Sequence, residues 1–150
     1  MLDLELEGQV AIVTGASRGL GRSSAVALLE QGVRVLAVAR SIDELRKLEA
    51  EHPDAVRAVQ CDMQDAAAVA ALPQQALDAF GRLDIVVNNA GIAPAGRFVE
   101  QSPAVWQQVM AVNVTAPMLL AQAAGRTMLA QGSGKIINVS SQTSSIVALV

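Results

Sequence analysis

A glycine-rich turn near the N-terminus holds the first residues that could do chemistry. The segment Thr14-Gly15-Ala16-Ser17-Arg18-Gly19-Leu20-Gly21 directly follows an apolar run at residues 10–13. Its glycines allow a sharp turn in which the backbone can approach a ligand without a Cβ in the way. A helix that begins at Gly19 would add free N–H groups and the positive end of its dipole, which together bind a pyrophosphate. The turn therefore predicts a phosphate site, although such glycines also occur for packing alone.

The residues after the next apolar run bear on the choice of nucleotide. That run ends in Ala39-Arg40-Ser41, without a carboxylate. In dinucleotide-binding folds an acidic residue at this place accepts from the ribose 2′-hydroxyl of NAD, whereas an arginine favours the 2′-phosphate of NADP. Arg18, in the glycine turn, could reach the same phosphate. We predict NADP(H) rather than NAD(H); the alternative is that Arg40 is a solvated residue at a helix start.

Short apolar runs alternate with longer helical segments along the whole chain. Runs at residues 10–13, 33–39, 56–61, 83–87 and 135–139 predict strands, and helices are expected at about 19–31, from 41, 65–80 and 102–131. An alternating order of this kind requires right-handed crossovers and helices on both faces of a parallel sheet. The fold class is therefore α/β, doubly wound, with a ligand crevice at the carboxyl ends of the central strands.

Helix boundaries are marked by polar caps and prolines. Ser41 and Glu44 form a predicted capping box, Asp65 a predicted N-cap, and Ser102 a cap followed by proline at the first helical position. Pro73 is expected to kink or split its helix because it removes a backbone donor. A bend is also expected near Pro117.

Composition limits the classes of function. The 150 residues fit one domain, with 52% hydrophobic, 17% charged and 2% aromatic residues and a net charge of -3. No basic stripe appears, which argues against nucleic-acid binding. The N-terminus lacks the pattern of a signal peptide, and apolar stretches are interrupted before the roughly 18 residues that a membrane span needs. We expect a cytoplasmic protein without nucleic-acid or membrane partners.

A few conspicuous side chains are assigned to structure instead of chemistry. The single cysteine, Cys61, cannot form an internal disulfide, which points to a reducing compartment, and it is expected to be a buried strand residue. His52 is expected at the surface, and Trp106 on the apolar, packed face of the long helix. No cluster of metal ligands or paired carboxylates is found, so no metal is predicted.

The joint pattern of motifs resembles the short-chain dehydrogenase/reductase family over essentially the whole chain. The pattern T-G-x-x-x-G-x-G is joined by Asp62 after the third run, by Asn88-Asn89-Ala90-Gly91 after the fourth, by Asn113 in the long helix, and by Ser140-Ser141 after the fifth. The segments Ala39-Arg40-Ser41 and Asn138-Val139-Ser140-Ser141-Gln142 look most like its carbonyl and L-xylulose reductases. This resemblance points to small ketones, sugars or polyols as substrates, with a 3-oxoacyl reductase or a steroid-type enzyme as the alternatives.

The resemblance also implies roles for individual residues. Ser141, rather than Ser140, would hydrogen-bond the substrate carbonyl, and Asn113 would support a water chain to the family's lysine. Asn88 would tie neighbouring strands together. The cofactor would be held by Gly15, Ser17, Arg18, Gly19, Leu20, Gly21, Arg40, Asp62, Met63, Asn89, Ala90 and Gly91.

One part of the family's catalytic set is not found in the chain. The family's tyrosine follows its serine by about thirteen residues, which falls beyond Val150, and the chain has no tyrosine. We therefore expect residues 1–150 to be the incomplete cofactor-binding domain of a longer enzyme, truncated after the fifth strand and inactive alone. The fifth strand would be an exposed edge. The resemblance also implies a homo-oligomer through the long helix, whose apolar stripe includes Val105, Val109 and Val112.

Two functions remain open at this point. The first is an NADP(H)-dependent oxidoreductase of carbonyl and alcohol substrates. The second is a non-catalytic dinucleotide-binding or assembly module without the proton donor. A flavodoxin-like signalling domain is disfavoured, because such folds lack the N-N-A-G and paired-serine motifs.

Overall fold

A five-stranded parallel sheet organises the computed structural model, which describes residues 4–141. The strand order is β3-β2-β1-β4-β5. The strands are β1 Val10–Thr14, β2 Arg34–Ala39, β3 Val56–Gln60, β4 Ile85–Asn88 and β5 Lys135–Asn138. The helices are α1 Gly19–Glu30, α2 Ile42–Glu51, α3 Ala66–Phe80, the 3-10 turn η1 Phe98–Glu100, α4 Pro103–Met110, the π-helical turn η2 Ala111–Thr115 and α5 Ala116–Gln131. The predicted doubly wound α/β fold is confirmed.

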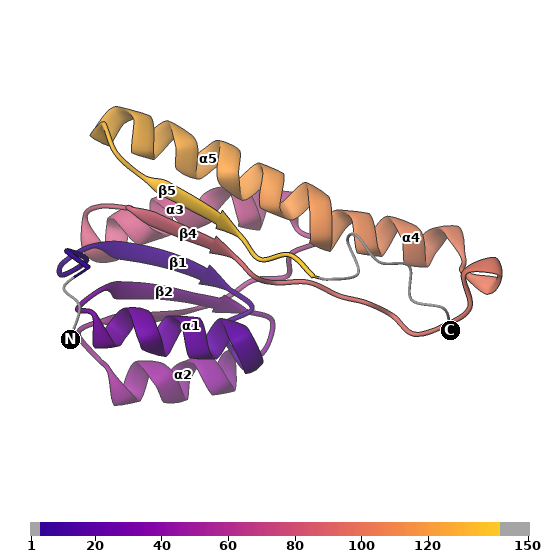
Figure 1. The fold of residues 1–150 in the computed structure, drawn as a ribbon, viewed down its shortest axis with the longest axis horizontal. Helices are drawn as coiled ribbons and strands as arrows, with labels where there is room; N and C mark the ends of the chain where they lie inside the picture. Colours follow the sequence, from indigo (N-terminus) through magenta and orange to yellow (C-terminus); the bar gives the residue numbers. More distant parts are fainter. Residues whose placement is uncertain (1–3, 142–150) are drawn as a thin grey trace.

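Helices cover both faces of this sheet (Figure 1). Helices α1 and α2 lie on one side, and α3 and the long α4–α5 helix lie on the other. Alternate residues of β1 supply the two cores: Val10 and Ile12 pack toward α3 and α5, whereas Ala11 and Val13 pack toward α1 and α2. All four are fully buried, which explains why the strand reads as a continuous apolar run.

The strand order reverses beside β1, and this reversal creates the site. The chain leaves β1 toward β2 and β3 on one side, and later returns to β4 and β5 on the other. The loops that follow β1 and β4 therefore diverge at the carboxyl edge of the sheet. Such a switch point leaves a crevice that no crossover helix fills.

An ion pair that the sequence analysis did not predict lies at the amino ends of β1 and β4, at the end of the sheet opposite the crevice. Asp84 is 5% exposed; its carboxylate accepts from the Val10 N–H at 2.9 Å and from the Arg82 guanidinium at 2.8 Å. Burial alone would raise the pKa of Asp84, but these hydrogen bonds bring the pKa below its ordinary value. The ionised carboxylate thus joins β1 to the start of β4.

Two of the three predicted caps form. Asp65 accepts from the Ala68 N–H at 3.0 Å, and the Ser102 hydroxyl accepts from the Val105 N–H at 3.3 Å. The predicted capping box at Ser41 is wrong, because the Ser41 side chain makes no capping hydrogen bond. Its expected partner Glu44 is instead engaged by Lys47, one turn further on.

The prolines act differently from one another. Helix α3 continues through Pro73 as one element, so the expected split does not occur. The long helix departs from α geometry in the π-helical turn η2, directly before α5 and Pro117. Pro117 has no N–H for the carbonyl of Asn113, and its ring crowds that carbonyl, so the turn before it widens. The π-helical turn thus lies directly before the proline, and the bend expected near Pro117 stays a prediction.

The long helix is less buried than the sequence suggested. Its core face comprises Val112, Ala116, Leu120, Ala124 and Met128. Val112 therefore belongs to this chain's own core and not to an outer stripe, which corrects the expected oligomer stripe at that position. Trp106 is 61% exposed, so its predicted packing within the chain is also wrong.

The same helix has a composition that membrane-spanning helices share. Residues Pro103–Gln131 contain an 18-residue window with a mean hydropathy of 1.2, of which 17% is buried, contrary to the expectation that apolar stretches would be too short. Alanine, valine, leucine and methionine produce this value. The residues of its core face recur every four positions and pack on α3 and the sheet.

Candidate cofactor-binding site

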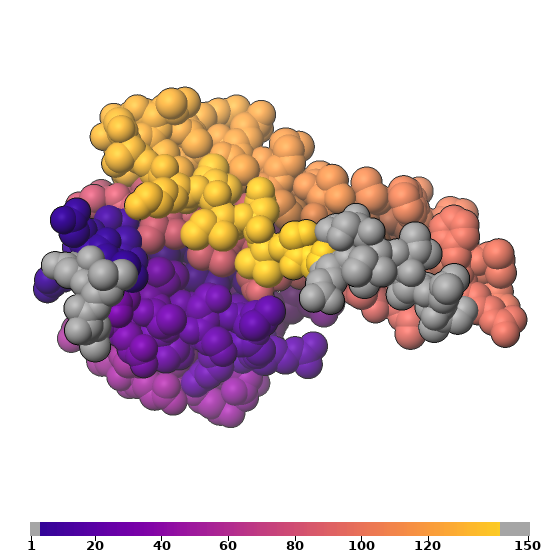
Figure 2. All heavy atoms as spheres, in the orientation of Figure 1, coloured from indigo at the N-terminus to yellow at the C-terminus, as the bar shows by residue number. Residues whose placement is uncertain are grey.

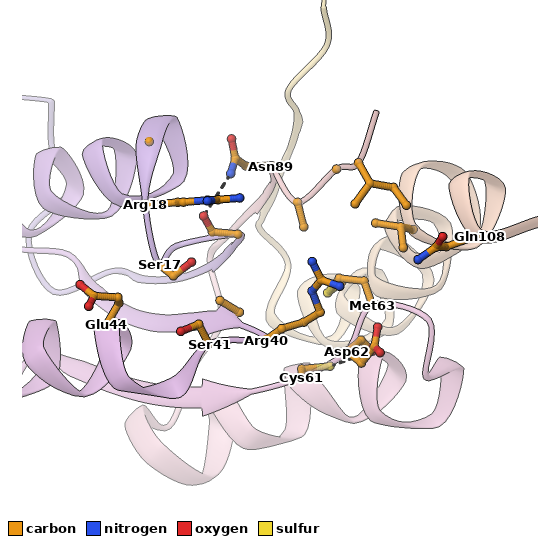
Figure 3. Close-up of a pocket in the computed structure, with 17 residues that line it drawn as sticks. Ser17, Arg18, Arg40, Ser41, Glu44, Cys61, Asp62, Met63, Asn89 and Gln108 are labelled. Atoms are coloured by element: carbon orange, nitrogen blue, oxygen red, sulfur yellow. Dashed lines mark hydrogen bonds between the residues drawn. The ribbon is translucent and has the colours of Figure 1, made fainter. Parts of the chain in front are cut away.

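A cavity of about 620 Å³ opens at the carboxyl edge of the sheet. Figure 3 shows its lining side chains, which come from the ends of β1, β2, β3 and β4 and from the long helix. The lining residues are Gly15, Ser17, Arg18, Gly19, Ala39, Arg40, Ser41, Glu44, Cys61, Asp62, Met63, Asn89, Ala90, Gly91, Ile92, Gln108 and Val112. Its size and position are those of a cofactor pocket in an open α/β sheet.

The glycine turn forms one wall because its backbone must come close to the neighbouring strand. Gly15 has φ +68°, and a Cβ there would lie 2.8 Å from the Asn89 Nδ2. A Cβ at Gly21 would overlap the Gly15 carbonyl, so Gly21 allows α1 to pack on the turn. Gly19 has φ +56°, a conformation that favours glycine although the space around it is open.

The N-terminus of α1 is left without a side-chain cap. The N-cap residue Arg18 makes no capping hydrogen bond, unlike Asp65 and Ser102 at the starts of α3 and α4. The first-turn N–H groups of α1 therefore remain available at the pocket wall, together with the positive end of the helix dipole. A phosphate fits this position both sterically and electrostatically.

A hydrogen-bonded hub at Thr14 holds the floor of the pocket. The Thr14 hydroxyl donates to the Val87 carbonyl at 3.4 Å and accepts from the N–H groups of Asn89 and Ala90, both at 3.0 Å. The Asn89 Nδ2 donates back to the Thr14 carbonyl at 3.0 Å. Thr14 is 1% exposed, so this buried hydroxyl joins the ends of β1 and β4.

The two asparagines of the N-N-A-G segment have different tasks. Asn88 donates from Nδ2 to the Asn138 Oδ1 at 2.9 Å, which links β4 to β5 as predicted. The Asn88 Oδ1 is buried and has no hydrogen-bond partner within residues 4–141. Asn89, by contrast, lines the pocket and uses its amide to fix the glycine turn.

Asn113 secures the loop that follows β4. Its Oδ1 accepts from the Ile92 N–H at 2.9 Å, and its Nδ2 donates to the Ile92 carbonyl at 2.8 Å. Both backbone groups of Ile92 are therefore held by one side chain from the π-helical turn. The loop residues Ala90, Gly91 and Ile92 consequently form a fixed wall of the pocket.

The far wall lies at the ends of β2 and β3. The Gln60 Nε2 donates to the Arg40 carbonyl at 2.9 Å, which ties the two strand ends together. Asp62 accepts from the Gln64 N–H through Oδ1 at 2.9 Å. Burial, with smaller contributions from Asp65 and Asp62, raises the pKa of the Cys61 thiol. Cys61 is 4% exposed and stays protonated at neutral pH, so it is a packing residue at the edge of the cavity, just past β3.

Comparison with known proteins identifies the family behind this geometry. Residues 9–148 match the family model described as short chain dehydrogenase. The chain belongs to the short-chain dehydrogenase family. It is 37% identical to D-threitol dehydrogenase of Mycolicibacterium smegmatis over 147 residues, and 40% identical to L-xylulose reductase of Mesocricetus auratus over 144 residues.

These alignments cover nearly all of this chain and little more than half of each relative. They span 96% of the chain and 56% of the D-threitol dehydrogenase, and 95% of the chain and 57% of the L-xylulose reductase. A metagenomic short-chain oxidoreductase solved in complex with NADP is 42% identical, with a TM-score of 0.84 over 90% of this chain and 63% of that structure.

Most residues that the family resemblance assigns to the cofactor line this one cavity. They are Gly15, Ser17, Arg18, Gly19, Arg40, Asp62, Met63, Asn89, Ala90 and Gly91. Gly21 lies under the turn, and Leu20 is 71% exposed outside the lining. Asn113 is not itself a lining residue, but it forms hydrogen bonds to the lining residue Ile92. Ser140 and Ser141 are exposed residues just after β5 and are not lining residues.

Several lining residues were not foreseen. Ser41 and Glu44 lie at the start of α2, and Gln108 and Val112 lie four residues apart on one face of the long helix. The four-residue spacing with Asn113 next to it could have indicated that this helix face meets the pocket. His52 is exposed, as predicted.

Proposed function

We propose that this chain supplies the NADP(H) site of an oxidoreductase that transfers a hydride between the nicotinamide and a carbonyl or alcohol substrate. The observation that carries the proposal is the pair of arginines, Arg18 and Arg40, which line the cavity from the glycine turn and from the end of β2. A hydrogen bond between a guanidinium and a phosphate contributes about 1.5–3 kcal/mol, roughly one to two powers of ten in affinity.

The residues present fit a dinucleotide. The glycine turn is a cradle that a Cβ at Gly15 or Gly21 would fill, and the uncapped N-terminus of α1 faces it. When bound, the cofactor supplies or accepts the hydride. Asn89, Ala90 and Gly91 would position its nicotinamide half, and Asp62 and Met63 its adenine half.

The relatives support a substrate among small polyols, sugars and ketones. D-threitol dehydrogenase, sorbitol dehydrogenase and L-xylulose reductase are similar to this chain at 37%, 35% and 40% identity. In the proposed reaction Ser141 donates a hydrogen bond to the substrate oxygen, which polarises the carbonyl. Asn113 keeps the loop after β4 in register with the nicotinamide.

A non-catalytic dinucleotide-binding module is the second candidate. The observation that favours it is that the cavity lining supplies dinucleotide-binding residues, whereas Ser141 is not among the lining residues. Binding of NADPH without turnover of small ketones by the protein at its natural length would support this candidate. Turnover would exclude it.

The first prediction tests the cofactor. Isothermal titration calorimetry should show NADPH binding at least about tenfold tighter than NADH, because two arginines face the 2′-phosphate. Arg40→Asp should lower that ratio by about ten- to a hundredfold, because it removes one guanidinium and adds a carboxylate that accepts from the 2′-hydroxyl. Arg46→Asp is the matched control, since Arg46 is exposed on α2 outside the cavity. An unchanged ratio in Arg40→Asp would remove the NADP(H) assignment.

A further inference from the structure

A carboxylate lies in the wall that should receive a phosphate. Glu44 is a lining residue in the first turn of α2, four positions after Arg40. In Figure 3 it lies on the same side of the cavity as Ser17 and Ser41. Its side chain is 46% exposed. An unpaired carboxylate at this place would repel an anionic group on the ribose.

The carboxylate of Glu44 is paired within its own helix. The Lys47 Nζ donates to the Glu44 Oε1 at 2.6 Å. The hydrogen bond and the positive charge of Lys47 lower the pKa of Glu44, so Glu44 is ionised at neutral pH and its charge is paired with that of Lys47. Arg22 of α1 holds the same turn by donating to the Glu44 carbonyl at 3.4 Å.

We propose that Lys47 is a specificity-determining residue of the cofactor site, although it is not itself a lining residue. By binding Glu44 it cancels a negative charge in the cavity wall and allows a 2′-phosphate to approach Arg18 and Arg40. This inference rests on the proposed NADP(H) site and deepens it. Lys47 acts through Glu44, so it is a positioning residue and has no direct part in hydride transfer.

Loss of Lys47 has two effects, and both lower the ratio of NADPH to NADH affinity. The freed Glu44 carboxylate repels the 2′-phosphate of NADPH, and it also becomes available as an acceptor for the 2′-hydroxyl of NADH. For a carboxylate and a phosphate several ångströms apart in a solvated cavity, this repulsion should lower NADPH affinity about three- to tenfold at low salt. The effect should be smaller at 0.15 M salt, where the Debye length is about 8 Å. The ratio of NADPH to NADH affinity should fall.

The experiment compares four variants of the 150-residue chain by calorimetric titration with NADPH and with NADH. Lys47→Met should lower the affinity ratio by about three- to tenfold in 20 mM salt, and by less in 300 mM salt. Lys47→Arg should keep the ratio of the unmodified chain. Glu44→Gln combined with Lys47→Met should restore it, because the repelling charge is gone.

Arg46→Met is the matched control. Arg46 neighbours Lys47 on α2 and is exposed, and its side chain makes no hydrogen bond or ion pair within residues 4–141. The Arg46→Met variant removes the same net charge as Lys47→Met without freeing Glu44. Its ratio of NADPH to NADH affinity should therefore stay within about twofold of that of the unmodified chain. Far-UV circular dichroism checks that each variant is folded.

The outcomes separate this inference from the proposed function. If the unmodified chain prefers NADPH and Lys47→Met behaves like Arg46→Met, the role of Lys47 is overturned and the NADP(H) site stands. A ratio that falls equally at both salt concentrations, or that the double variant does not restore, also overturns it. If the unmodified chain binds neither dinucleotide or prefers NADH, the proposed function fails and the inference fails with it.

Discussion

Several polar side chains at this site form hydrogen bonds to the backbone of another segment. Thr14, Asn89 and Asn113 each use their polar groups on main-chain atoms of another segment. The shape of the glycine turn and of the loop after β4 therefore depends on these side-chain contacts with the backbone. Thr14 is the most connected of them, because one hydroxyl serves a carbonyl and two N–H groups.

Replacement of Thr14 by valine is the residue-scale prediction. The shape is kept, but the N–H groups of Asn89 and Ala90 lose their acceptor in a buried place, which costs about 1–3 kcal/mol each. Urea denaturation should show a free energy of unfolding lower by about 2–4 kcal/mol, with weaker NADPH binding. Thr14→Ser keeps the hydroxyl and should recover most of both losses. A valine variant as stable as the unmodified chain would show that water replaces the hydroxyl.

Elements of secondary structure were largely readable from the chain, and the failures have physical causes. Strands buried on both faces are apolar, so the run at residues 10–13 was clear, whereas the strand expected at 83–87 begins only at Ile85, after the buried Asp84. The capping box does not form at Ser41, and the Glu44 carboxylate accepts from Lys47 instead, a competition that local sequence rules do not rank. The exposure of Trp106 depends on whether another surface covers it, and hydropathy does not contain that information.

The contact of the long helix with the loop after β4 gives the element-scale prediction. Asn113→Ala removes both hydrogen bonds to Ile92 and raises helix propensity, so the helix persists while the loop loosens. Hydrogen exchange at the Ile92 amide should become about tenfold faster or more, and NADPH affinity should fall about three- to tenfold. Gln122→Ala is the matched control, because Gln122 is an exposed amide on α5. Equal exchange rates in the two variants would refute the role of Asn113 as a clamp.

At the scale of the whole molecule, the described residues 4–141 leave one side of the long helix exposed. Figure 2 shows α4 and the segment before it extending beyond the body that the other elements form. Trp106, Val114 and Met118 are 61%, 52% and 52% exposed along this helix. The core face of the helix is already used, so these side chains form a separate apolar surface. A surface of this kind on a water-exposed helix favours association.

We therefore expect self-association through the outer surface of the helix, as the family resemblance implies. Light scattering after size exclusion should give a mass above the 15.6 kDa of one chain, rising with concentration. Trp106 is the chain's one tryptophan, so its fluorescence emission should shift to shorter wavelength as it is covered.

Negative charges introduced on this helix surface test whether association runs through the helix or through the exposed strand β5. Trp106→Glu with Met118→Glu should return the mass to that of a single chain, because two carboxylates would have to be buried in the contact. Leu4→Glu, at another exposed apolar residue, should leave the association unchanged. Strand β5 offers a competing surface, since Ile136 and Ile137 are 38% and 49% exposed at the end of the sheet. If the double variant still associates, the contact runs through β5 and the helix surface is not the interface.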